Sequence, residues 1–195
     1  MFVLFEGIDT SGKTTQIEKL KSVNADIKVT FEPGATKLGK ELRAILLEKD
    51  FKISKAAELL LFLADRAEHY EKIIAPNAEK LVISDRGFLS GIAYALTNNQ
   101  NLDVPFLIEA NRFALGGKLP DKIVFFKTTK ELLISRIKTK SHDKIESRGI
   151  EYLLTVQENM EKVLKKIDIN HMILDANESI ESLHVKIKTF LSGNF

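Results

Sequence analysis

The sequence contains no cysteine, which excludes a disulfide scaffold and a metal site built on thiolates. It also lacks long apolar segments, because its apolar runs are far shorter than the roughly 20 residues that a membrane-spanning helix needs. The chain begins with an apolar, β-rich run rather than a basic segment before a cleavable stretch, so we expect no signal peptide. We therefore expect a cytoplasmic protein without a membrane partner.

Neither sign of charge dominates the chain. Its 29 basic and 27 acidic residues give a net charge of +2, which argues against a broad nucleic-acid surface. The four histidines show no metal-ligand or catalytic-triad spacing, and we predict structural or surface roles for all of them. A length of 195 residues with 44% apolar residues predicts a single domain, 1–195, with a substantial core.

Short apolar segments alternate with helical stretches along the chain. This alternation predicts an α/β fold with a parallel sheet and helices on both of its faces. The predicted strands are Phe2–Glu6, Ile27–Phe31, Leu81–Asp85, Ile123–Lys127 and His171–Leu174. Because ligands in such folds bind beyond the carboxyl ends of the strands, we expect the site at that edge of the sheet.

A phosphate-binding loop follows the first predicted strand. Residues 7–14 read Gly-Ile-Asp-Thr-Ser-Gly-Lys-Thr and match the G-x-x-x-x-G-K-[ST] pattern in full. In such a loop the backbone N–H groups face phosphate oxygens, Lys13 reaches the β- and γ-phosphates, and the Thr14 hydroxyl holds Mg²⁺. A glycine-rich turn with a chance lysine is the alternative, which the flanking strand and helix disfavour.

The stretch from Ser54 to Ile74 is predicted to form one long helix. Its 3-4 spacing predicts a core face, whereas Phe62 and Arg66 share a different face. An aromatic ring beside an arginine can hold a planar ligand, although simple burial of Phe62 in the core remains an alternative. The predicted core face consists of Leu60, Leu63, Ala67, Tyr70 and Ile74.

Charged residues mark further candidate positions. Asp85 ends an apolar strand and can hold Mg²⁺, and Arg86 beside it can clamp a phosphate, unless the two form a local salt bridge. Arg43 lies off the apolar stripe of its helix, which leaves a surface role open. A basic segment at about 136–150 is either a solvated face or a mobile lid over the phosphates.

Together these stretches resemble the thymidylate kinase family over nearly the whole chain. The phosphate loop is shared by a large superfamily. The Glu-Pro-Gly turn, the Phe62/Arg66 helix and Asp85-Arg86-x-x-x-Ser90 are much more specific to this family. The matching stretches are residues 5–9 and 12–15, 32–36, 42–43, 61–66, 84–86, 90–91 and 94, 119–121, 143–146 and 174–176. The resemblance implies a P-loop fold with sheet order 2-3-1-4-5, a homodimer, and Mg²⁺-dependent transfer of the γ-phosphoryl of ATP to dTMP on the route to dTTP.

The resemblance also implies roles for residues around the acceptor. Phe62 would stack on thymine and Arg66 would bond its carbonyl edge. Arg43 and Arg86 would hold the monophosphate, and Asp9 would accept from the sugar 3′-hydroxyl. The complete set implied for dTMP is Asp9, Glu32, Pro33, Arg43, Phe62, Arg66, Arg86, Ser90, Gly91 and Tyr94. Within it, Tyr94 would pack beneath the sugar and Glu32 would lie near the acceptor phosphate or magnesium.

On the donor side the resemblance implies contacts from the loop and from two distant segments. Arg136 would flank the adenine or the phosphates, and residues 175–177 would lie beside the adenine. The set implied for ATP is Gly7, Ile8, Asp9, Thr10, Ser11, Gly12, Lys13, Thr14, Thr15, Arg136, Asp175, Ala176 and Asn177. The implied catalytic residues are Lys13, Asp9, Arg86, Lys144 and Arg148, with Thr14 and Asp85 at the metal.

The chain departs from the family pattern in several places. Thr10 stands where one branch carries a catalytic arginine, so the missing cation would come from the lid. There Lys144 replaces the usual arginine, and both Lys144 and Arg148 remain candidates. Phe31, Ala35 and Ala95 are further departures. The alternatives are a kinase with another acceptor and a non-catalytic P-loop module, whereas the Asn-Lys-x-Asp stretch of a small GTPase is absent from the sequence.

Overall fold

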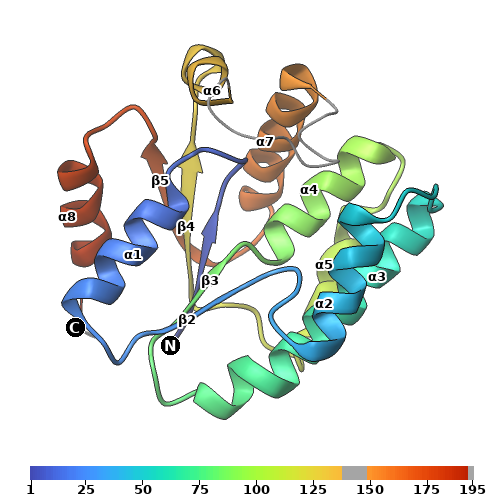
Figure 1. Ribbon diagram of the computed structural model, residues 1–195, viewed down its shortest axis with the longest axis horizontal. Helices are drawn as coiled ribbons and strands as arrows, with labels where there is room; N and C mark the ends of the chain where they lie inside the picture. Colours follow the sequence, from blue (N-terminus) through green and yellow to red (C-terminus); the bar gives the residue numbers. More distant parts are fainter. Residues whose placement is uncertain (138–148, 193–195) are drawn as a thin grey trace.

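The computed structural model describes residues 1–137 and 149–192 and is built on a five-stranded parallel sheet (Figure 1). The strand order is β2-β3-β1-β4-β5, which confirms the predicted P-loop topology. The strands are β1 (Phe2–Glu6), β2 (Lys28–Phe31), β3 (Val82–Asp85), β4 (Lys122–Lys127) and β5 (Asn170–Asp175). Each lies within one residue of its predicted start and end. The three inner strands β3, β1 and β4 are largely buried, and a buried strand leaves a short apolar run in the sequence.

The central strand β1 supplies both faces of the core. Leu4 packs into a cluster on one face, whereas Val3 and Phe5 pack into a second cluster on the other. Successive side chains of a strand point to opposite faces, so an uninterrupted apolar run is required at this position. Register is fixed on both sides, with Val3 beside Ile83 of β3 and Leu4 beside Ile123 of β4.

Helices cover both faces of the sheet, as predicted (Figure 1). Apolar residues of α1 and α8 join one core cluster, and those of α4, α5 and α7 join the other. The helices are α1 (Lys13–Val23), α2 (Lys37–Arg43), α3 (Lys55–His69), α4 (Phe88–Asn98), α5 (Val104–Ala114), α6 (Lys130–Ile137), α7 (Ile150–Leu164) and α8 (Ile180–Leu191). In the described ranges, none of these helices is long and apolar enough to cross a membrane.

The predicted long helix over 54–74 is divided. Regular helix ends at His69, and a π-helical turn (Tyr70–Ile74) follows. Its predicted core face is wrong at Leu60, which is 64% exposed, although Ile74 is buried. The physical reason is that α3 contacts α2, α4 and α5, with Asp65, Arg66 and His69 on its buried face. Polar groups in a buried position need hydrogen-bond partners. The buried polar face of α3 is therefore a candidate part of a functional site.

Candidate active site

The loop between β1 and α1 has the backbone conformation that its glycines predict. Gly7 has φ +146°, and a Cβ there would lie 2.7 Å from the carbonyl oxygen of Phe126. Gly12 also has positive φ, and Thr10 adopts φ 62° between them. Lys13 follows at the start of α1, and its ammonium donates to the carbonyls of Gly7 (3.0 Å) and Ile8 (3.1 Å). The loop therefore brings a buried cation to the N-terminus of a helix, where anions bind.

The Lys13 ammonium titrates well below its ordinary range. Burial is the main cause, and the positive charge of Arg86 adds to it, so that the pKa falls from 10.5 to about 8. Asp85 and Asp9 act in the opposite direction but do not outweigh burial. A phosphate beside this lysine would restore the charged form, because an adjacent opposite charge stabilises the ammonium.

Oxygen ligands suited to magnesium lie beside the loop. The Thr14 hydroxyl donates to Asp85 Oδ2 at 3.4 Å, while Asp85 Oδ1 is buried without a hydrogen-bond partner and lies 3.9 Å from Lys13 Nζ. Over residues 1–137 and 149–192 no group of three His, Asp or Glu side chains could hold a metal by itself. One carboxylate and one hydroxyl fit Mg²⁺, which retains water and takes its other ligands from phosphates.

A cavity of about 770 Å³ extends from the loop toward β5 and α8. Arg136 borders it and donates to the carbonyls of Thr10 (2.8 Å) and Ala176 (3.1 Å), so it joins the loop to the segment after β5. Of the three residues predicted beside the adenine, Ala176 lines this cavity. Asp175 instead accepts hydrogen bonds from both the backbone and the side-chain amide of Asn177, which pairs those two side chains with each other.

A second, smaller cavity of about 110 Å³ adjoins the first. The structure brings every residue predicted at the acceptor site to its wall, and Phe62 is half-buried there rather than enclosed in the core. Four residues, Asp9, Glu32, Arg43 and Arg86, line both cavities. The smaller cavity is lined by Asp9, Glu32, Pro33, Arg43, Leu47, Phe62, Arg66, Arg86, Gly87, Ser90, Gly91 and Tyr94.

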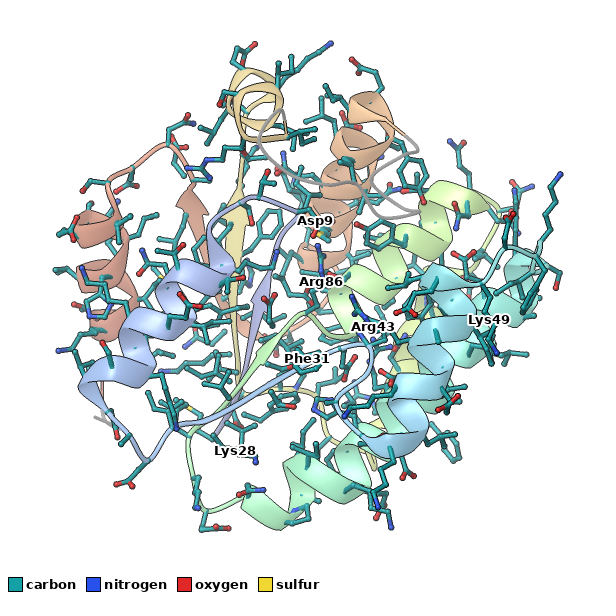
Figure 2. All side chains as sticks on the ribbon, viewed as in Figure 1. Asp9, Lys28, Phe31, Arg43, Lys49 and Arg86 are labelled. Carbon is teal, nitrogen blue, oxygen red and sulfur yellow. The ribbon has the colours of Figure 1, made fainter. Side chains whose placement is uncertain are left out.

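Arg86 lines both cavities. Figure 2 shows it between Asp9 and Arg43. Arg86 adopts φ 69°, and its guanidinium donates to Asp9 Oδ1 (2.6 Å), the Gly7 carbonyl (3.0 Å) and Ser90 Oγ (3.2 Å). Burial lowers the pKa of Arg86, but the negative charge of Asp9, together with Tyr94 and Asp85, outweighs burial and raises the pKa. The local salt bridge considered between Asp85 and Arg86 is therefore replaced by one between Asp9 and Arg86.

Two buried carboxylates lie behind the cavity walls. Glu6, which the sequence analysis did not single out, bonds the hydroxyl of Ser90 and accepts from its backbone N–H at 3.3 Å. Burial raises the pKa of Glu6. Glu32 accepts from Arg66 and contacts His69 Nδ1 at 2.8 Å. Burial opposes ionisation of Glu32 too, but Arg66 and His69 outweigh it, and its pKa is lowered.

Lys144 and Arg148, the two candidate lid cations, lie outside the described residues, as does most of the predicted lid segment at about 136–150. Within that segment, Arg136 and Ile137 belong to α6, and Gly149 precedes α7.

A parallel sheet of this order, a phosphate loop after its central strand and a second cavity sharing two arginines with the first define a P-loop nucleoside monophosphate kinase. The profile of the thymidylate kinase family matches residues 5–187. The chain therefore belongs to the thymidylate kinase family, a family of enzymes.

Individual relatives agree with this assignment. The chain is 55% identical to a thymidylate kinase of Campylobacter concisus, over 98% of this chain and 99% of that protein. It is likewise 55% identical to a thymidylate kinase of Campylobacter hominis, over 98% of this chain and all of the relative. The crystal structure of thymidylate kinase from Ehrlichia chaffeensis superposes with a TM-score of 0.76 at 27% identity, over 98% of both chains.

Proposed function

We propose that this protein transfers the γ-phosphoryl group of ATP to dTMP, giving dTDP and ADP, with residues 1–195 acting as one catalytic domain. The observation that carries the proposal is the pair of adjoining cavities that share Asp9, Glu32, Arg43 and Arg86. The larger cavity contains the phosphate loop, and the smaller combines an aromatic wall with arginines. Cations at the shared wall suit a reaction in which two phosphates must approach each other.

The donor would bind with its phosphates along residues 7–15 and its base toward Arg136 and residues 175–177. Lys13 would neutralise charge on the β- and γ-phosphates. Thr14 and Asp85 would hold Mg²⁺, which supplies charge neutralisation and geometric order to the phosphates. Asp85 Oδ1, which is buried without a hydrogen-bond partner, supports this assignment.

The acceptor would bind in the smaller cavity. Phe62 would stack on the base while Arg66 bonds its carbonyl edge, and Tyr94, Ser90, Gly91 and Pro33 would enclose the sugar and phosphate. Arg43, whose guanidinium donates to the Pro33 carbonyl at 3.0 Å, is held at the wall facing Arg86 (Figure 2). Asp9 would accept from the sugar hydroxyl while its other interaction, with Arg86, fixes its direction.

The chemistry requires positioning more than covalent help from the protein. An oxygen of the acceptor phosphate forms a bond to the γ-phosphorus, and the bond from that phosphorus to the β–γ bridging oxygen breaks as ADP leaves. The acceptor oxygen is already anionic, so no strong base is needed. Arg86 and Arg43 would hold two mutually repelling phosphates in line, which is the main contribution of the site.

A coupled assay of ADP release with ATP and a panel of nucleoside monophosphates tests this function. We expect dTMP to have the highest kcat/KM. Phe62→Ala should raise the KM for dTMP about tenfold or more, because a base loses roughly 1–3 kcal/mol when its aromatic partner is removed. Phe51→Ala, at an exposed phenylalanine outside both cavities, is the matched control. Unchanged dTMP kinetics in Phe62→Ala would contradict the stacking role, and absence of dTMP turnover would contradict the function.

A homodimer through α3 and α5 is part of the proposal. These two helices pack against each other and expose large apolar side chains: Leu60 (64%), Phe106 (59%) and Phe113 (86%). Contiguous apolar exposure of this kind marks interaction surfaces. Sedimentation of the wild-type protein should give a dimer, and Phe113→Glu should shift it toward monomer. Val185→Glu, at an exposed valine of α8, should leave the mass unchanged, and a monomeric wild type would refute the dimer.

A further inference from the structure

We propose that Asn111, together with Glu32, is a positioning residue that aims Arg66 at the acceptor base and thereby sets the selectivity for a base carbonyl over a base amino group. The inference rests on the proposed function, because it assigns a cause to the acceptor preference of the same cavity. It also gives Glu32 a different role from the contact with phosphate or magnesium that the family resemblance implied. Asn111 was not among the site residues found from the sequence.

The guanidinium of Arg66 is held from two sides. Its Nε and Nη2 both approach Glu32 Oε2, at 2.9 and 2.7 Å, and its Nη1 donates to Asn111 Oδ1. Arg66 is 3% exposed and Asn111 is 1% exposed. Hydrogen bonds to a charged group are stronger than those between neutral groups, and an unpaired buried donor is costly. The side chain of Arg66 therefore has little freedom to turn.

The orientation of the Asn111 amide is itself fixed. Its Nδ2 donates to the carbonyl of Leu107, one turn earlier in α5, at 2.7 Å. The amide nitrogen is thereby occupied within its own helix, and the oxygen is the atom that faces Arg66. An acceptor in this position suits the guanidinium, which has donors and no acceptor.

Glu32 and Asn111 leave part of the Arg66 guanidinium available. A guanidinium carries five N–H bonds, and Glu32 and Asn111 occupy those on Nε, one side of Nη2 and one side of Nη1. A Cβ added to Gly91 would lie 3.2 Å from both Nη1 and Nη2, so α4 approaches the guanidinium closely at a position without a side chain. Arg66 and Gly91 both line the smaller cavity.

The N–H groups of Arg66 that remain at the cavity wall are donors, and they select by the chemistry of the base edge. Thymine and uracil present a carbonyl at the position where cytosine presents an amino group. A fixed donor bonds the carbonyl, whereas an amino group is itself a donor, so neither the Arg66 N–H nor the base amino group gains a partner. Sites built to make a polar contact reject analogues that lack its partner far more strongly than apolar pockets do.

The support for Glu32 continues into the sheet. Glu32 Oε1 lies 2.8 Å from His69 Nδ1, and His69 Nε2 lies 2.7 Å from the Thr30 hydroxyl. Thr30 belongs to β2 and His69 to α3, so the network joins the sheet, α3 and α5 behind one wall of the cavity. Buried hydrogen-bond networks restrict the motion of their members, which is the property that a positioning role requires.

The test compares Asn111→Leu with Asn111→Asp in steady-state assays with dTMP and dCMP. Asn111→Leu removes the acceptor and should raise the KM for dTMP about tenfold, reduce the preference for dTMP over dCMP by a similar factor, and leave the KM for ATP unchanged. Asn111→Asp restores an oxygen facing Arg66 and should keep dTMP kinetics within about threefold of wild type. Asn159→Leu, at a buried asparagine of α7 that bonds Thr97, is the control and should leave selectivity unchanged.

A folded Asn111→Leu protein with unchanged melting temperature, unchanged KM for ATP and an unchanged dTMP to dCMP ratio would overturn the inference. If Asn111→Leu does not fold, Glu32→Gln provides the second test, because it retains the shape but loses the charge that holds Arg66. It should also reduce the dTMP to dCMP ratio, and an unchanged ratio would again overturn the inference. A wild-type protein that fails to phosphorylate dTMP would instead contradict the proposed function itself.

Discussion

Replacing Lys13 with alanine should lower kcat for dTMP phosphorylation by about 1,000-fold, with much less effect on the KM for dTMP. The lysine is the cation buried at the base of the phosphate loop. Its charge is needed most when negative charge develops on the transferred phosphoryl group, so its loss should be seen mainly in kcat. Initial-rate assays at saturating ATP and dTMP measure the effect.

The control for Lys13 is Lys19→Ala in the same helix. Lys19 forms a surface ion pair with Glu181 at 2.7 Å, and such pairs contribute little. A Lys13→Ala protein with kcat within about tenfold of wild type would contradict the role given to this loop.

The lowered pKa of Lys13 gives the same prediction a second readout. With a pKa of about 8 in the free protein, part of the lysine population is neutral near that pH. Bound phosphates favour the charged form, so ATP binding should take up protons near pH 8, and this uptake should fade as pH falls below the pKa. Calorimetry in buffers of different ionisation enthalpy measures the uptake, which Lys13→Ala should abolish.

Arg86→Ala should lower kcat/KM for dTMP by about 1,000-fold. This residue lines both cavities, and its removal would leave the Asp9 carboxylate without the partner that now lies 2.6 Å away. The acceptor phosphate would lose a charge-assisted contact and its alignment with the donor. The lost contact weakens binding of dTMP, and the lost alignment raises the energy of the transition state. Both kcat and KM should therefore change.

Two comparisons make the Arg86 test specific. Arg86→Lys keeps a point charge without the planar fork and should retain activity between that of the alanine variant and wild type. Arg112→Ala, at an exposed arginine of α5 paired with Glu109, should behave as wild type. A loss of less than about tenfold in kcat/KM for a folded Arg86→Ala protein would show that Arg86 does not hold the acceptor.

Much of this architecture was predictable because short segments of the sequence are sufficient to indicate it. The strand Phe2–Glu6 starts with an unbroken apolar run, residues 2–5, since both faces of β1 are buried, and its bounds agree with the structure. The loop over residues 7–14 follows from its glycines and Lys13. The resemblance to the family then supplied the residues predicted for the acceptor, all of which line the smaller cavity.

The parts that sequence reasoning missed depend on partners far away in the chain. Asn111 bonds Arg66, which lies 45 positions earlier in the sequence. A single asparagine in an amphipathic helix forms no sequence pattern from which this contact could be predicted. Leu60 has the spacing of a core residue, but periodicity does not reveal whether an apolar face meets the same chain or another surface. Glu6 lies at the end of a buried strand, and its bond to Ser90 depends on packing of α4 against β1.

In the proposed function, the wall shared by the two cavities couples the binding of the two substrates. Arg43 and Arg86 face both, so the first anion to arrive changes the electrostatic potential that the second one meets. Thermodynamic linkage requires this effect to be reciprocal: the factor by which ATP alters the affinity for dTMP equals the factor by which dTMP alters the affinity for ATP. Substitutions at the shared residues therefore alter that coupling free energy, whereas a change at Phe62, outside the larger cavity, alters acceptor affinity alone.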